Sequence, residues 1–120
     1  MESTETTTVY YDGACPICTR EIGLYRRCAG AERVDWVDVA ARDAGSAAAP
    51  DLPRADALAR FHVRGPDGAL VSGAAAFATL WRALPAWRWL GRLAAVPPVT
   101  AVLELCYRAF LVVRRVARRS

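Results

Sequence analysis

Apolar residues recur along this chain at intervals that predict short strands alternating with helices. Val9-Tyr10-Tyr11 is a β-branched and aromatic run that predicts a strand, and the turn pair Asp12-Gly13 ends it. From Pro16 the apolar positions fall three or four residues apart, which predicts a helix that stops near Gly30. One face of that helix is expected to hold Ile17, Glu21, Leu24 and Cys28.

The middle of the chain alternates strand patterns with turn residues. A second strand is predicted over Val34–Val39, followed by a short Ala-rich helix and a loop within Ala40–Pro53. Leu58–Arg64 is a third strand candidate. The turn residues of Gly65–Gly68 then lead into a returning strand at Ala69–Val71, which completes a predicted β-hairpin.

The last third of the chain has a helical pattern interrupted by prolines. A helix is predicted over residues 73–84, an aromatic-rich connector of one or two helical turns over residues 87–93, and a final helix over residues 99–115 after Pro97-Pro98. A β-α-β unit followed by a β-hairpin and a helix makes a small mixed β-sheet flanked by helices. We therefore expect an α/β, thioredoxin-like fold with an extra C-terminal helix.

Length and composition predict one domain. The chain has 120 residues, 54% of them hydrophobic, which suffices for a single core, and we expect a flexible leader over residues 1–8 and one domain over residues 9–120. The leader lacks the basic and apolar regions of a signal peptide, and Val96–Val113 contains Glu104 and Arg108, so a transmembrane helix is not expected. These features favour a cytoplasmic location. All sixteen basic residues are arginine and alanine is abundant, which suggests a GC-rich bacterial genome.

The residues with the clearest chemical potential are Cys15 and Cys18, a Cys-x-x-Cys pair at a predicted strand-to-helix junction. A cysteine at a helix N-terminus has its thiolate favoured by free N–H groups and the macrodipole, and Pro16 suits the first helical turn. Cys18 lies one turn further on, where it can close a disulfide with Cys15. Asp12 either accepts a proton during exchange or simply makes the turn with Gly13.

Other readings of the cysteines and the aromatic residues remain open. A structural zinc site needs four ligands, and here one close pair stands beside isolated cysteines and the single histidine, His62, so metal binding is disfavoured. Cys28 and Cys106 are expected to be small buried hydrophobes, and His62 a packing residue. The tryptophans are expected in the core, or alternatively on a docking surface for partners. They are Trp36, Trp81, Trp87 and Trp89.

Charge is concentrated in the last third of the chain. Residues 81–120 hold eight arginines and one glutamate, a formal charge of +7, whereas residues 1–80 hold eight arginines and eleven acidic residues, −3. The basic end is either a solvated helix end or a contact for an anionic membrane or acidic partner. No aromatic residues interleave with the arginines of residues 114–119, so nucleic acid is not expected. The candidate lipid-headgroup ligands are Arg114, Arg115, Arg118 and Arg119, and Glu104 is expected to pair with Arg108.

The segment Tyr11-Asp12-Gly13-x-Cys15-Pro16-x-Cys18 resembles the signature of the DCC family, named for its Asp-x-x-Cys-x-x-Cys motif. Weaker matches follow in order at residues 61–63, 67–68, 73–76, 80–85 and 107–108. The resemblance implies a thioredoxin-like thiol–disulfide oxidoreductase with Asp12, Cys15 and Cys18 as its motif positions. One departure from ordinary thioredoxins is that no proline directly precedes the predicted third strand, where those proteins carry a cis-proline.

The leading functional hypothesis is therefore an enzyme. Reduced Cys15 attacks a disulfide in a protein or small-thiol substrate, Cys18 resolves the intermediate, and a cellular thiol reductant supplies electrons without a bound cofactor. The alternative is a non-catalytic or redox-sensing module that docks a partner or an anionic membrane surface through the Arg- and Trp-rich C-terminal part.

Overall fold

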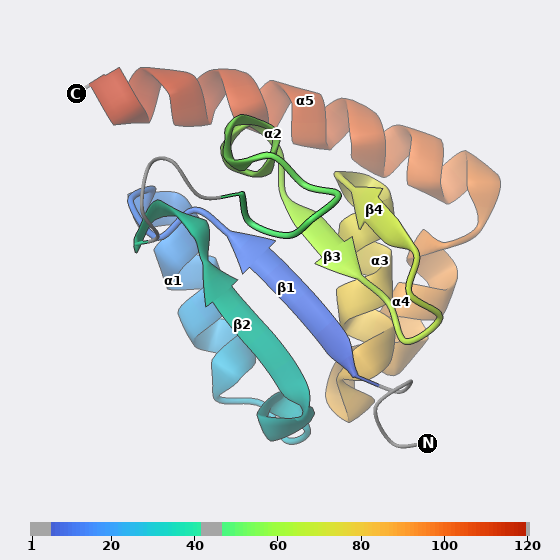
Figure 1. Cartoon of the computed structure of the whole chain (residues 1–120). Coiled ribbons are helices and arrows are strands. Elements are labelled where there is room, and N and C mark those ends of the chain that lie inside the picture. The colour runs from blue at the N-terminus through green and yellow to red at the C-terminus, as the bar shows by residue number, and fades with distance from the viewer. Residues whose placement is uncertain (1–5, 42–46, 120) are drawn as a thin grey trace.

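A mixed sheet of four strands forms the centre of the computed structural model, which describes residues 6–41 and 47–119, with side chains up to residue 116 (Figure 1). The strands are β1 (Thr7–Tyr11), β2 (Val34–Asp38), β3 (His62–Arg64) and β4 (Leu70–Ser72). Their order is β2-β1-β3-β4, with β1 parallel to β2 and the other two pairings antiparallel. A helix connects the parallel strands β1 and β2, and a hairpin connects the antiparallel strands β3 and β4, as the sequence pattern predicts.

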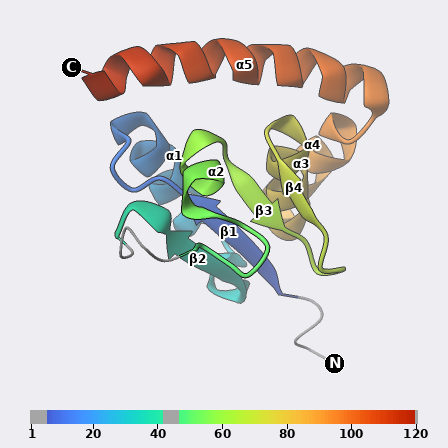
Figure 2. The same ribbon diagram turned by 45° about the horizontal axis from the view of Figure 1, so that its top comes forward.

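Helices cover both faces of this sheet (Figures 1 and 2). Within the described residues they are α1 (Pro16–Arg26), α2 (Arg54–Ala59), α3 (Ala74–Ala83), α4 (Arg88–Ala94) and α5 (Pro97–Arg119), with 3₁₀ turns η2 (Ala31–Arg33), η3 (Val39–Ala41) and η4 (Pro85–Trp87). The succession β1-α1-β2-α2-β3-β4-α3 confirms the predicted thioredoxin-like fold, and α5 is the predicted C-terminal extension.

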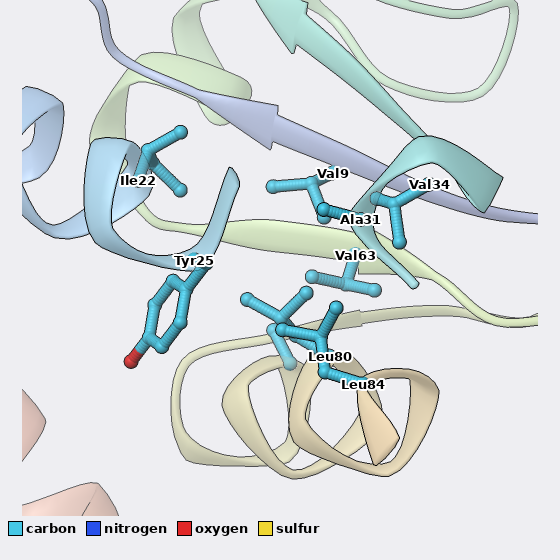
Figure 3. Close-up of a cluster of buried hydrophobic side chains, with 9 residues drawn as sticks. Val9, Ile22, Tyr25, Ala31, Val34, Val63, Leu80 and Leu84 are labelled. Carbon is cyan, nitrogen blue, oxygen red and sulfur yellow. The ribbon is translucent and has the colours of Figure 1, made fainter. Parts of the chain in front are cut away.

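The core divides into two clusters because successive strand residues point to opposite faces of the sheet. Val9 of β1 and Val63 of β3 are fully buried against Tyr25 of α1 and Leu80 of α3 (Figure 3). Tyr10, the residue after Val9, belongs to the second cluster on the opposite face. Its other buried members are Val39, Ala48, Leu52 and Ala57. Of the four tryptophans, Trp89 alone does not pack on the first cluster, and it is 67% exposed.

α5 lies across one side of the molecule, past the ends of α2 and α3 (Figures 1 and 2). It is anchored by polar side chains: Glu104 accepts the Ala74 N–H at the start of α3 at 3.1 Å, and the Tyr107 hydroxyl accepts the Phe61 N–H at 2.6 Å. The predicted Glu104–Arg108 pair is present at 3.2 Å. α5 therefore satisfies backbone groups that other elements leave unpaired at their ends.

Several boundaries differ from the prediction. β1 begins at Thr7, so Thr7 and Thr8 belong to a strand rather than to the leader, whose residues 1–5 lie outside the described part. The predicted strand over Leu58–Arg64 is wrong in its first half, because Arg54–Ala59 forms α2 and β3 begins only at His62. Of the short helix expected within Ala40–Pro53, residues 42–46 also lie outside the described part, and residues 47–53 contain a bridged turn.

The buried face of α1 and the first residue of α5 also differ from the prediction. In α1 the expected face is wrong, since Ile17 is 37% and Leu24 49% exposed, whereas Ile22 and Tyr25 are buried. In α5 the helix begins at Pro97 rather than after the proline pair, because a helix's first turn does not need proline's missing N–H. Among the described residues no single helix is long and apolar enough to cross a membrane. The segments 85–94 and 97–116 have the length and apolar composition of a membrane span only when they are combined, and the chain bends by 99° between them.

Candidate active site at the start of α1

The connection between β1 and α1 is fixed by backbone hydrogen bonds. The Asp12 carbonyl accepts the Cys15 N–H at 3.1 Å, and Asp12 Oδ1 accepts the Ala14 N–H at 3.0 Å. Gly13 donates its N–H to Asp38 Oδ1 at the end of β2, at 3.0 Å, and a Cβ at Gly13 would collide with that carboxylate. Asp12 thus makes the turn that the sequence indicates, and its side chain is 2% exposed.

Cys15 is the N-cap residue of α1, and its side chain is fully buried. Its Sγ accepts the backbone N–H of Cys18 at 3.4 Å, and Pro16 occupies the first turn as predicted. An N–H directed at the sulfur and the positive end of the helix dipole both stabilise negative charge that develops at this position during a reaction. The geometry is therefore suited to a nucleophilic sulfur.

Cys18 lies in the first turn of α1, close to Cys15, and is half-buried. Burial, followed by the hydrogen bond with Cys15, raises the pKa of the Cys18 thiol to about 12. The Cys18 sulfur is therefore held as a thiol at neutral pH. The two sulfurs thus differ in their surroundings, because Cys15 accepts a backbone N–H at the start of α1, whereas the N–H donor nearest Cys18 belongs to the Arg114 side chain.

The side chain of Arg114 approaches Cys18 from α5. Its guanidinium donates to the carbonyls of Leu58 and Ala59, at the end of α2, at 2.9 and 2.8 Å. Its Nη1 lies 3.9 Å from the Cys18 sulfur, and the residue is only 6% exposed. The prediction that Arg114 binds lipid headgroups is therefore wrong, because its side chain points into the protein. Its i, i+7 spacing from Tyr107, which is also buried, was the available signal in the sequence.

Two adjoining hollows lie beside Cys18, between α1, α3 and α5. A small pocket is lined by Asp12, Cys18 and Arg114 among others. The neighbouring cavity, of about 230 Å³, has mainly aromatic and aliphatic walls. Four residues line both hollows: Glu21, Phe77, Tyr107 and Phe110. The described surface beside Cys18 is thus a mostly apolar recess with two arginines and two carboxylates.

The other candidate residues lie outside this pair. Cys28 follows α1, and its sulfur accepts the Trp87 Nε1–H at 3.3 Å. Cys106 is exposed on α5, which contradicts the prediction that it is buried, although it borders the aromatic cavity. His62 is half-buried in β3 with its Nδ1 2.8 Å from the Arg60 carbonyl, as a packing residue would be. Within residues 6–41 and 47–116, no three His, Cys, Asp or Glu side chains are grouped as metal ligands.

Comparison with known proteins identifies one matching family. The sequence model of the DCC1-like thiol-disulfide oxidoreductase family matches residues 9–119, nearly the whole chain. No curated protein and no solved structure shows significant similarity. The matched range includes Asp12, Cys15 and Cys18 and extends to the end of α5.

Proposed function

Because the chain belongs to the DCC1-like thiol-disulfide oxidoreductase family, we propose that it exchanges disulfides through Cys15 and Cys18, with Cys15 as the nucleophile. The observation that supports this most is the Cys18 N–H directed at the Cys15 sulfur at the start of α1. Cys18, with its pKa near 12, is a poor initial nucleophile at neutral pH. Cys15 is buried in the dithiol form, so attack requires a local opening of the loop before α1.

The proposed cycle transfers two electrons from the protein to the substrate. The Cys15 thiolate attacks one sulfur of a substrate disulfide, forms a mixed disulfide and expels the other sulfur as a thiolate, which takes up a proton. The Cys18 thiol then loses its proton, and its sulfur attacks Cys15. This step closes the Cys15–Cys18 disulfide and releases the second substrate thiol. A cellular thiol reductant restores the dithiol, and we place the cycle in the cytoplasm, where such donors are kept reduced.

Two neighbouring groups assist the second step in this proposal. Arg114 is a positioning residue that stabilises the negative charge forming on the Cys18 sulfur, since an opposite charge this close lowers a thiol's pKa. Asp12, which lines the same pocket, accepts the Cys18 proton. The substrate is a protein disulfide or a small disulfide whose organic part fits the apolar recess.

Trapping experiments test the order of attack. Cys18→Ser is expected to accumulate a mixed disulfide on Cys15, whereas Cys15→Ser is expected to abolish turnover without accumulating one. Cys28→Ser and Cys106→Ser serve as matched controls that retain activity. Peptide mass spectrometry after alkylation locates the trapped adduct. An adduct on Cys18 in the Cys15→Ser protein would reverse the proposed roles, and full activity of Cys15→Ser would refute the thiol mechanism.

The proposed roles of Arg114 and Asp12 are tested by the pH profile of the second step, which a purely structural defect would leave unchanged. Arg114→Gln is expected to slow closure of the mixed disulfide about tenfold at pH 8, and to shift the pH profile of that step upward. The control is Arg115→Gln, which changes an exposed arginine next to it. Asp12→Asn keeps an acceptor for the Ala14 N–H but removes the base. It should therefore slow the same step and change its pH profile. An unchanged pH profile in both variants would remove these roles.

A further inference from the structure

The outer side of α5 has an unusual composition for a helix at a protein surface. Five apolar side chains there are between 56% and 66% exposed: Val102, Leu105, Val112, Val113 and Val116. Their spacing along the chain places them on one face of the helix, and the exposed Cys106 and Ala109 lie on the same face. We call these seven residues the outer stripe.

The outer stripe faces away from the rest of the molecule. Tyr107 and Arg114, on the opposite side of α5, are 5% and 6% exposed and are hydrogen-bonded to other elements. Nothing described lies beyond the helix on its outer side (Figures 1 and 2). From Val102 to Val116 the stripe runs for about 20 Å at 1.5 Å per residue. Soluble monomers seldom expose an uninterrupted apolar surface of this extent, because water excludes it.

The charged residues beside the outer stripe indicate which kind of surface would cover it. Arg108 and Arg115 lie along one edge of it, and the Arg108 side chain is 67% exposed. The single acidic residue beyond Asp67 is Glu104, whose carboxylate points inward to Ala74 and Arg60. The surroundings of the stripe are therefore basic, within a C-terminal third whose formal charge is +7.

We propose that the outer stripe of α5 docks the protein on the surface of an anionic lipid bilayer, with the helix axis in the plane of the interface. An apolar face edged by arginines suits that environment, because the side chains enter the acyl boundary while the guanidinium groups meet lipid phosphates. This proposal goes beyond thiol–disulfide exchange and does not depend on it.

A second copy of the chain fits the stripe less well. Paired helices usually place opposite charges along the edges of their apolar seam. Here the described residues of that edge offer arginines without outward-facing carboxylates, so two copies would bring like charges together. Anionic headgroups supply the missing negative charge.

Vesicle co-sedimentation of the full, reduced chain tests the proposal. We expect binding to vesicles of phosphatidylcholine with 30% phosphatidylglycerol, little binding to phosphatidylcholine alone, and weaker binding as salt rises. Leu105→Glu is expected to weaken binding at least tenfold. The matched control is Leu24→Glu, the same change at a 49% exposed position of α1, which should bind like the wild type. Arg115→Gln should weaken binding about fivefold, against Arg26→Gln as its control.

Two further measurements separate the alternatives. Alkylation of the exposed Cys106 by a charged reagent should slow when anionic vesicles are added, because the stripe is then covered. Thiol–disulfide exchange with a soluble substrate should be unchanged in Leu105→Glu, so a failure of one proposal does not imply failure of the other. The docking proposal is overturned by absence of sedimentation at low salt or by equal losses in Leu105→Glu and Leu24→Glu. A concentration-dependent dimer that Leu105→Glu abolishes would overturn it in favour of a second copy.

Discussion

Replacing Glu104 should reveal how strongly the C-terminal helix is attached. Its carboxylate accepts the Ala74 N–H at 3.1 Å, the Arg60 guanidinium at 2.7 Å and the Arg108 guanidinium at 3.2 Å. The Ala74 N–H is one of the unpaired donors at the start of α3, and the N-cap residue Gly73 has no side chain to serve it. Glu104 therefore caps one helix from a position 30 residues away.

The expected magnitude follows from these three contacts. Loss of an N-terminal cap costs about 1 kcal/mol, and loss of a half-buried, charge-assisted bond such as that to Arg60 costs about 1.5–3 kcal/mol. The Arg108 pair is exposed and contributes about 0.3–0.5 kcal/mol. Because these terms are not independent, Glu104→Ala should lower the free energy of unfolding by about 2–4 kcal/mol. Arg108→Gln, the control, should lower it by less than about 0.5 kcal/mol.

Urea titration followed by circular dichroism measures both variants, and pH adds a second check. Burial alone would raise the pKa of Glu104, but hydrogen bonds from Arg60 and Ala74 outweigh it and lower the pKa. A carboxyl group with a lowered folded-state pKa stabilises the protein above its unfolded value of about 4.3 and loses that contribution as pH falls. The difference between the wild type and Glu104→Gln should thus be constant from pH 7 to 5 and shrink below pH 4. Equal losses in Glu104→Ala and Arg108→Gln would refute the capping argument.

Three further substitutions probe backbone hydrogen bonding and packing by the same urea titration. Tyr107→Phe leaves the Phe61 N–H without its acceptor and should cost about 1–3 kcal/mol; a loss below 0.5 kcal/mol would mean that water replaces the hydroxyl. Gly30→Ala should cost about 2 kcal/mol, because Gly30 has φ +90° and an added Cβ would lie 2.7 Å from Pro85 Cδ. Gly23→Ala, in open space within α1, should instead stabilise the protein by about 0.5–1 kcal/mol. A gain of stability in Gly30→Ala or a loss in Gly23→Ala would contradict the structure.

The features that the sequence predicted well depend on neighbours in the chain. The turn at Asp12-Gly13, the N-terminal position of Cys15 and the hairpin at Gly65–Gly68 follow from local rules, because their hydrogen bonds join residues a few positions apart. α2 was not predicted, because Leu58 and the residues after it also fit a strand. The structure settles the matter by burying Ala57 in the second core cluster.

The buried face of α1 could not be assigned from its pattern alone. Ile17, Leu24 and Cys28 fit helical spacing as well as Ile22 and Tyr25 do, and both sets are apolar. The direction in which the chain enters from β1 decides between them, and it turns Tyr25 toward Trp81, whose Nε1–H donates to the Tyr25 hydroxyl at 3.0 Å. That contact joins residues 56 positions apart, which no short-range pattern encodes.

α5 shows the same limit more sharply, because its apolar stripe would ordinarily be assigned to the core. The structure places its polar side inward, since Glu104, Tyr107 and Arg114 complete the hydrogen bonding of backbone groups at Ala74, Phe61 and the end of α2. Those groups would be costly to bury unpaired, so their satisfaction outweighs the burial of a row of valines. The same orientation brings the Arg114 guanidinium to Cys18 and leaves the outer stripe for another surface to cover. A helix that docks by its polar side thus links the environment of the Cys18 sulfur to the proposed contact with lipid.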